Sequence, residues 1–235
     1  MGAIYRREMG SFFTSGLGYV FLTVFYAFSG YFFYTKVIES GISDTSPMFA
    51  SMFIMFIFLI PVLTMRLLSE EKKNRTDQGL LTAPVNLWEI VMGKYLAAFT
   101  LFLIAECIVF VYALLLRYLG SVVWTSLIGN FAAMLFLGAA FIAIGLFVSS
   151  LTENQMSAAV VSFVVMIVFY LFDETLLLRV SNDRIREILS ALSFRTRYYE
   201  FTKGVFSLSS IIFFLSTAFL FNFFTVKVLE KRRWS

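Results

Sequence analysis

The chain has 235 residues, of which 60% are hydrophobic and 14% are charged, and its mean hydropathy is +0.84. A soluble globular domain is about a quarter charged, so this composition excludes an ordinary soluble fold and predicts a chain that lies in a lipid bilayer. The formal charge of +4 does not indicate nucleic-acid binding, because membrane proteins gather basic residues beside their cytoplasmic helix ends.

Residue types that catalysis needs are scarce. The sequence contains no histidine, which excludes zinc sites built on imidazole, Ser-His-Asp triads and histidine proton relays. Its single cysteine, Cys107, cannot form an intrachain disulfide. No GxxxxGK[ST] motif is present, so we expect no P-loop nucleotide site and no cofactor in this chain. The composition therefore favours a non-catalytic membrane protein.

The first 14 residues predict a short amphipathic helix on the membrane surface, with its apolar side chains facing lipid. Those side chains are Ile4, Phe12 and Phe13. This start lacks the compact apolar core and small-residue cleavage site of a signal peptide.

Six apolar stretches follow, and each is long enough to cross a bilayer as a helix. They cover residues 17–35, 48–67, 95–116, 124–150, 156–172 and 208–228. Two longer polar segments separate them, at residues 68–94 and 173–207. The sequence thus predicts one all-α integral membrane domain with six transmembrane helices.

An even number of crossings places both termini on one side of the membrane. Basic residues that flank the helices are more numerous on that side, and most of those on the other side lie in the long segment 173–207, where acidic residues also occur. The distribution of Lys and Arg therefore predicts a multi-pass protein of the cytoplasmic membrane with both termini in the cytoplasm.

The polar segment 68–94 contains a predicted short helix. Pro84 disfavours a helical conformation in the residue before it, and Asn86 can cap the helix that follows, with Glu89 completing a capping box. Apolar Leu87, Trp88 and Ile90 make this helix amphipathic. Two interpretations stay open: a rigid helix presented to the cytoplasm, or an interfacial anchor with the indole of Trp88 among the lipid headgroups.

One ionisable residue, Glu106, lies within a predicted transmembrane helix. A carboxyl group there costs several kcal/mol and marks a possible functional site. It could bind a cationic group of a substrate, carry a proton or pair with a polar residue of another helix. The alternative is a protonated glutamic acid that is hydrogen-bonded to a neighbouring helix.

The segment 173–207 alternates basic and aromatic residues, among them Arg195, Arg197, Tyr198 and Tyr199. We expect these side chains to form an outer gate, a docking surface for an extracytoplasmic partner, or a plain amphipathic cap over the helix bundle.

Three stretches resemble the type-2 ABC exporter permeases, in the order found in that family. RLLSEEKKNRT and LLTAPVNLWEIVMGKYLAA resemble its first cytoplasmic loop. SSLTENQMSAAV resembles the link between its fourth and fifth transmembrane helices, and LSFRTRYYEFTKGVFSL its extracytoplasmic re-entrant segment, with Gly204 as the final glycine. The sequence looks most similar to the small permeases of gliding-motility and nitrous-oxide-reductase-maturation systems.

This resemblance implies a permease subunit driven by a separate ATPase, which would bind ATP and Mg. Residues Asn86, Leu87, Trp88, Glu89 and Ile90 would form the coupling helix, and Glu70 and Glu71 would make salt bridges to the ATPase. A second copy or a related permease would complete the pathway, surrounded by lipid. The complex would export an amphipathic or hydrophobic substrate, or transmit force to an extracytoplasmic accessory protein.

Two other classes compete with this reading. Residues 70–75 fit the E-E-x-x-x-R pattern of intramembrane proteases, but those enzymes also need histidines. An ATP-independent channel would need a polar stripe through several transmembrane helices, whereas these carry only scattered polar residues apart from Glu106. A channel or a scaffold remains the alternative.

Overall fold

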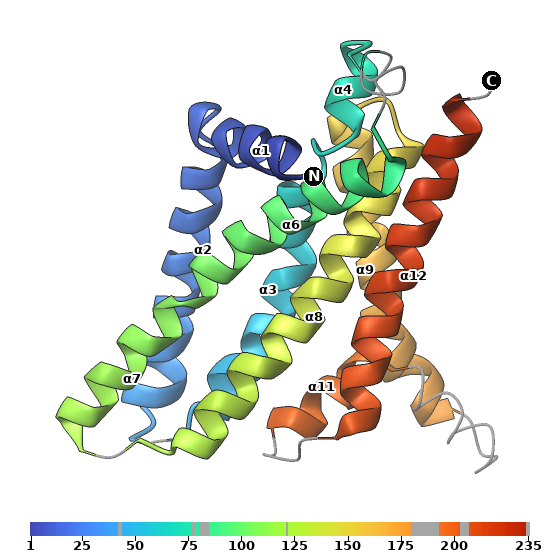
Figure 1. Ribbon diagram of the computed structural model, residues 1–235. Coiled ribbons are helices and arrows are strands. Elements are labelled where there is room, and N and C mark those ends of the chain that lie inside the picture. The colour runs from blue at the N-terminus through green and yellow to red at the C-terminus, as the bar shows by residue number, and fades with distance from the viewer. Residues whose placement is uncertain are drawn as a thin grey trace.

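The computed structural model describes residues 1–41, 44–76, 79, 85–120, 122–179, 193–202 and 207–233, with the backbone alone for 172–179. The described part of the chain is helical and contains no strand. Figure 1 shows helices running between two ends of a bundle, with both termini at one of them. We call this the upper end; it holds α1, α4, the first turn of α6 and the last turn of α12. The opposite, lower end holds α11 and the end of α7.

The predicted surface helix is present as α1 (Gly2–Thr14), but part of its apolar side packs inside the protein. Phe12 is buried, and Ile4 lies so close to α6 that a Cβ added to Gly93 would be 3.0 Å from its Cγ2 atom. The expectation that Phe12 contacts lipid is wrong, because α1 lies across the start of α6, which offers an apolar surface inside the protein. Contact of Phe13 with lipid stays a prediction. Gly16, with a φ of +75°, makes the turn into α2.

The next elements are α2 (Leu17–Phe33) and α3 (Ser46–Thr64), which pack side by side. At its C-terminal end, α2 continues directly into a π-helix, η1 (Tyr34–Ile38). At the upper end, α3 is followed by the short α4 (Ser69–Lys73). These helices agree with the predicted stretches 17–35 and 48–67 apart from a few residues at their ends.

The third predicted transmembrane helix differs most from expectation. The chain forms α6 (Leu87–Glu106), a one-residue break at Cys107, and α7 (Ile108–Leu119). The predicted separate helix at 86–90 is therefore the first turn of a longer one. The reason is local. No proline follows Ile90, and the low helix propensity of a single glycine, Gly93, is not enough to end a helix when the residues on both sides favour it.

The centre of the bundle is α8 (Trp124–Leu151), which packs along α12 (Leu208–Arg233) and also contacts α3, α6 and α9 (Gln155–Arg179). The helix α9 extends beyond the predicted residue 172, and the outer segment also contains α11 (Phe194–Thr202). The segment predicted at 173–207 therefore begins with the end of α9 rather than with a loop.

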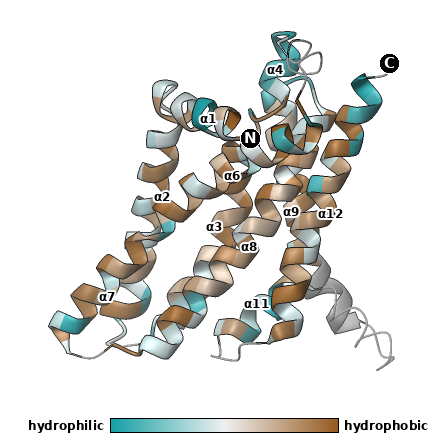
Figure 2. Ribbon diagram, viewed as in Figure 1, coloured by the Kyte–Doolittle hydropathy of each residue, from teal (hydrophilic) through white to brown (hydrophobic). Residues whose placement is uncertain are grey.

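Five helices of the described chain are long and apolar enough to cross a membrane. They are Leu17–Ile38, Ser46–Lys73, Leu87–Leu119, Trp124–Leu151 and Leu208–Arg233. The apolar part of α9, Gln155–Leu171, is shorter, although α9 also runs between the two ends (Figure 1). Figure 2 shows hydrophobic residues along the middle of the bundle and hydrophilic ones at its ends. The sixth crossing therefore stays a prediction.

Candidate functional site

The first turn of α6 holds the residues predicted to couple the chain to an ATPase. The Oδ1 atom of Asn86 accepts a hydrogen bond from the backbone N–H of Trp88 at 3.1 Å, which confirms the predicted N-cap. Glu89 does not close a capping box, because its carboxylate binds the N-terminal amine of Met1 at 2.7 Å. The exposed side chains are those of Asn86 and Glu89, whereas Leu87 and Ile90 are buried.

Trp88 joins this turn to the middle of α12. Its indole stacks on Phe219, with ring centroids 5.9 Å apart, and lies 6.2 Å from the ring of Phe223. A surface groove of about 380 Å³ lies between the two helices at this point. It is lined by Asn86, Leu87, Trp88, Phe223, Val226, Lys227, Glu230 and Arg233. The indole is thus a packing contact between α6 and α12. Its placement among lipid headgroups stays a prediction.

A buried ion-pair network holds α1, α4 and α6 together. The ammonium group of Lys94, only 1% exposed, lies 3.0 Å from a carboxylate oxygen of Glu8 and 3.0 Å from one of Glu71. Arg7 binds the same two carboxylates. Two cations therefore neutralise two anions, and because Lys94, Glu8 and Glu71 are largely buried, leaving these charges unpaired would be costly.

A second set of contacts ties α3 and α4 to their neighbours. Arg66 pairs with Glu70 at 3.0 Å and donates to the hydroxyl of Ser11 at 2.6 Å. The hydroxyl of Ser149, near the end of α8, accepts from the backbone N–H groups of Leu68 and Ser69 at 3.1 Å each. These groups connect the turn between α3 and α4 with both α1 and α8.

Both predicted ATPase contacts in this segment, Glu70 and Glu71, thus have ion-pair partners within the chain. A cavity of about 220 Å³ lies between them and α1, lined in part by Arg7, Glu8 and Lys94. Their contact with an ATPase stays a prediction. Sequence reasoning missed Lys94; the signal was a lysine at the start of a strongly apolar stretch, which needs a buried anion.

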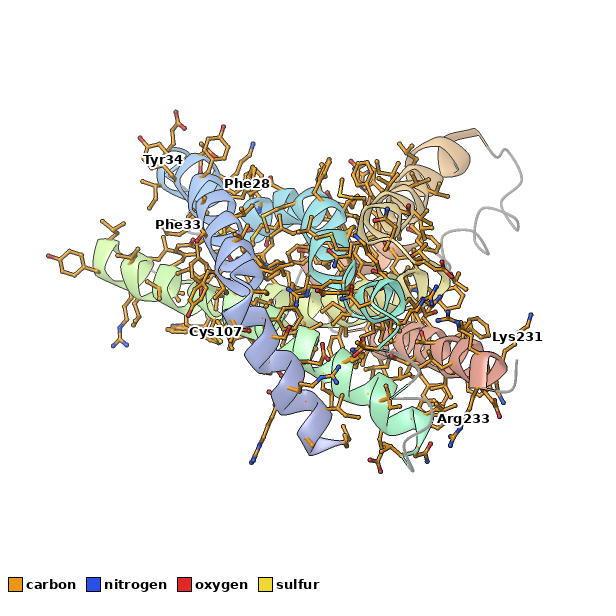
Figure 3. All side chains as sticks on the ribbon, turned by 90° about the horizontal axis from the view of Figure 1, so that it is seen from above. Phe28, Phe33, Tyr34, Cys107, Lys231 and Arg233 are labelled. Carbon is orange, nitrogen blue, oxygen red and sulfur yellow. The ribbon has the colours of Figure 1, made fainter. Side chains whose placement is uncertain are left out.

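The interior holds Glu106 at the end of α6, directly before the break at Cys107. Its side chain is fully buried, and neither carboxyl oxygen has a hydrogen-bond partner among the described residues. Cys107, in contrast, is exposed (Figure 3). Among the described residues, the hydrogen-bonded structural role predicted for Glu106 is not found. A partner beyond these residues or a movement of α6 would satisfy the group.

Replacing Glu106 by glutamine is expected to leave the thermal stability within a few degrees of wild type, because no intramolecular hydrogen bond is lost. Leucine at this position should raise the stability, since it removes an unpaired buried polar group. Thermal unfolding in detergent checks both. A large loss of stability in the glutamine variant would mean that the carboxyl group has a partner in the folded chain.

The outer residues of the prediction lie on α11 and pack inward. Arg195 lies over the rings of Tyr170 and Tyr199, at 5.3 and 5.5 Å from their centroids. Tyr198 is fully buried and donates to the backbone carbonyl of Phe49 at 2.8 Å.

Arg197 also packs onto its own chain, since it donates to the hydroxyl of Ser209 at 2.8 Å and lies over the ring of Phe213. These contacts fix α11 onto α3, α9 and α12. The predicted Gly204 lies outside the described residues.

A polar cluster at the lower end was not predicted. One carboxylate oxygen of Asp44 accepts from the hydroxyl of Ser126 at 2.6 Å and from the hydroxyl and backbone N–H of Ser46 at 2.8 and 3.1 Å. The same Ser46 hydroxyl oxygen lies 2.9 Å from the carbonyl oxygen of Thr202, and it accepts a hydrogen bond from the amide of Asn130 at 3.2 Å. The cluster joins the start of α3 to α8 and α11.

Burial raises the pKa of Asp44, but its three hydrogen bonds outweigh this effect and hold the pKa below the ordinary value of 3.8. A lowered pKa stabilises the fold above the unfolded-state pKa of about 3.9, and the contribution is lost as the pH falls through the folded-state value. We therefore expect Asp44→Asn to lower the melting temperature most at neutral pH, with the gap closing below about pH 4. A gap that does not change with pH would contradict this assignment; Glu39→Gln, an exposed carboxylate, is the control.

Metal ligands do not gather in the part of the chain that the structure describes, where no group of three or more Cys, Asp or Glu side chains could hold an ion.

Comparison with known proteins identifies the family. The sequence profile described as "ABC-2 family transporter protein" matches residues 3–228, nearly the whole chain. A search of curated proteins found no match. The profile match confirms the resemblance seen in the three sequence motifs, and together with the long apolar helices it makes this a multi-pass membrane protein. The chain therefore belongs to the ABC-2 family of transporter proteins, as a permease of that type.

Proposed function

We propose that this chain is the transmembrane subunit of an exporter that is driven by a separate ATPase subunit, with its upper end in the cytoplasm. Family membership supports the first part. The basic residues at the upper end support the second, because cytoplasmic ends of transmembrane helices are enriched in Lys and Arg. They are Arg6, Arg7, Arg66, Lys72, Lys73, Arg75, Lys94, Lys227, Lys231, Arg232 and Arg233.

The proposal rests on the first turn of α6, which exposes polar side chains to the solvent and at the same time packs against the rest of the bundle. Asn86 and Glu89 present polar groups to a partner, whereas Trp88 is stacked on α12. A force that a partner applies to this turn would therefore act on α6 and α12 together, because the two helices pack against each other here. The coupling element of this chain would be a helix end, not a separate helix.

Movement would be transmitted along α6 itself. At about 1.5 Å per residue, Leu87–Glu106 forms a rod of roughly 30 Å. Lys94 ties this rod to α1 and α4, so these elements would move with it as one body. The rod ends at the break beside Glu106, where α7 can change its direction relative to α6.

The subunit would work as a pair, either with a second copy or with a related permease, and ATP and Mg would be bound by the ATPase. The cargo would be an amphipathic or hydrophobic molecule, or the stroke would act on an extracytoplasmic partner, as the resemblance to gliding-motility and nitrous-oxide-reductase-maturation permeases implies.

The coupling role is tested by Glu89→Ala. This side chain is half exposed and makes only a surface ion pair, so its loss should cost less than about 1 kcal/mol of stability. We expect stimulation of the partner's ATP hydrolysis by the permease to fall about ten-fold, as for the loss of one charge-assisted contact.

The matched control is Glu39→Ala, which removes an exposed glutamate at the lower end. If the Glu89→Ala variant stimulated the partner's ATP hydrolysis as strongly as the wild-type permease does, this turn would be excluded as the coupling element. A loss of stimulation in both variants would point to a general defect instead.

A further inference from the structure

An apolar groove of about 500 Å³ opens on the side of the bundle between α2 and α3. This volume is typical of small-molecule sites. The groove is lined by Phe28, Phe32, Lys36, Ser51, Ile54, Met55, Phe58 and Leu59. Figure 3, seen from the upper end, places Phe28 on α2 beside α3. None of these residues belongs to the coupling turn, the ion-pair network or the interior around Glu106.

The groove has one polar end. Phe28, Phe32 and Lys36 follow at intervals of four residues and so share one face of α2 and its π-helical extension. Because α2 runs toward the lower end and α3 runs away from it, Lys36 and Ser51 lie nearest that end. The aromatic residues lie deeper, toward the middle of the bundle. The polar end thus faces the membrane surface and the apolar body runs toward the bilayer centre.

Lys36 supplies an uncompensated charge at this position. It is exposed, and no carboxylate of the described residues forms an ion pair with it. It lies within η1 (Tyr34–Ile38), and π-helical turns are rare and often found at functional sites. Farther along, Phe28, Ile54 and Phe58 are about half exposed, at 48%, 47% and 53%. An occupant would therefore cover apolar side chains and bring an anion to the ammonium group.

We infer that this groove binds an anionic phospholipid, with one acyl chain along α2 and α3 and the phosphate at Lys36 and Ser51. The groove has a cation and a hydroxyl group at one end, and aromatic and aliphatic side chains along the rest of its length. A phospholipid has the matching arrangement, with a charged headgroup at one end followed by an apolar acyl chain. A helix of a second copy would need a carboxylate at this exact depth to satisfy Lys36. The inference concerns lipid in the leaflet at the lower end and does not depend on the ATPase.

The test uses the full chain in phosphatidylcholine nanodiscs that contain a trace of a photoreactive lipid with a diazirine in its acyl chain. The probe is either phosphatidylglycerol or phosphatidylcholine, with the same chains. We expect labelled peptides from residues 28–36 and 51–59, with phosphatidylglycerol labelling about five-fold above phosphatidylcholine, as for one lysine facing an anionic lipid.

Three variants separate headgroup from chain recognition. Lys36→Gln should lower labelling by phosphatidylglycerol to the phosphatidylcholine level, whereas Lys36→Arg, which keeps the charge, should leave labelling by phosphatidylglycerol at the wild-type level. Ile54→Trp should reduce labelling by both probes, since the indole fills the groove. The matched controls are Arg117→Gln, which removes another exposed cation near the lower end, and Leu114→Trp, which adds an indole to the exposed face of α7; neither should change the labelling.

Equal labelling by the two probes, or labelling unchanged in Lys36→Gln, would overturn the inference. So would labelling spread evenly over all lipid-facing helices. Absence of lipid label from residues 28–36 and 51–59 would overturn it as well.

Discussion

Replacing Lys94 by methionine is expected to lower the free energy of unfolding by about 3–5 kcal/mol, the typical cost of removing one partner from a buried ion pair. The ammonium group is 1% exposed and lies between the carboxylates of Glu8 and Glu71. Without it, these two anions stay close together in a partly closed cavity, with Arg7 as their one remaining cation among the ion pairs described here. Unfolding in mixed micelles measures the loss.

Two further variants show whether charge is the cause. Adding Glu71→Gln to Lys94→Met should recover a large part of the stability, because it removes one of the two anions and leaves Arg7 to neutralise the other. Lys227→Met removes an exposed lysine that pairs with Glu230 and should cost less than about 1 kcal/mol. A loss for Lys94→Met no larger than that for Lys227→Met would contradict the buried network.

Replacing Gly145 by valine is expected to destabilise the protein by about 3 kcal/mol, at the upper end of the usual cost of overpacking a core. A Cβ at this position would lie 2.8 Å from the Cβ atom of Thr64 and closer still to its hydroxyl. Thr64 is fully buried and its hydroxyl donates to the carbonyl of Ile60, so it has no room to turn away. The helices α3 and α8 must therefore separate.

The matched control is Gly10→Val, since Gly10 lies in α1 with nothing within 4 Å of an added Cβ. That change should have almost no effect, because valine and glycine differ little in helix propensity. Thermal unfolding and the fraction of protein that elutes as a single species in detergent report both variants. Equal stability of the two would mean that α8 and α3 do not pack as closely as described.

The helices themselves were largely predictable, because a transmembrane helix has to be long and apolar wherever it lies in the bundle. The stretch 124–150 became α8 with a difference of one residue. What the sequence could not indicate is which surface a helix meets. Phe12 was expected in lipid and is buried, because α1 packs against α6 rather than the bilayer.

The candidate site was predictable only where the signal is local. The cap by Asn86 spans two residues and was predicted correctly. Glu89 binds Met1, and Lys94 binds Glu8, across more than 80 residues of sequence, so no spacing rule connects them. Where a helix ends also depends on several small free-energy contributions. The helix propensity lost at the one glycine after Ile90 was too small to separate the coupling turn from the rest of α6.

Docking of the first turn of α6 onto an ATPase can be tested by site-specific crosslinking. Cys107 is the chain's one cysteine and is replaced by serine, after which a cysteine is placed at Glu89 or, as the control, at Glu39. Each tagged variant is coupled to a thiol-specific photoreactive reagent in native membranes and purified in mild detergent. We expect a P-loop ATPase to co-purify and to crosslink to position 89 but not to position 39. A chain that purifies alone, with no ATPase crosslinked to position 89, would contradict it.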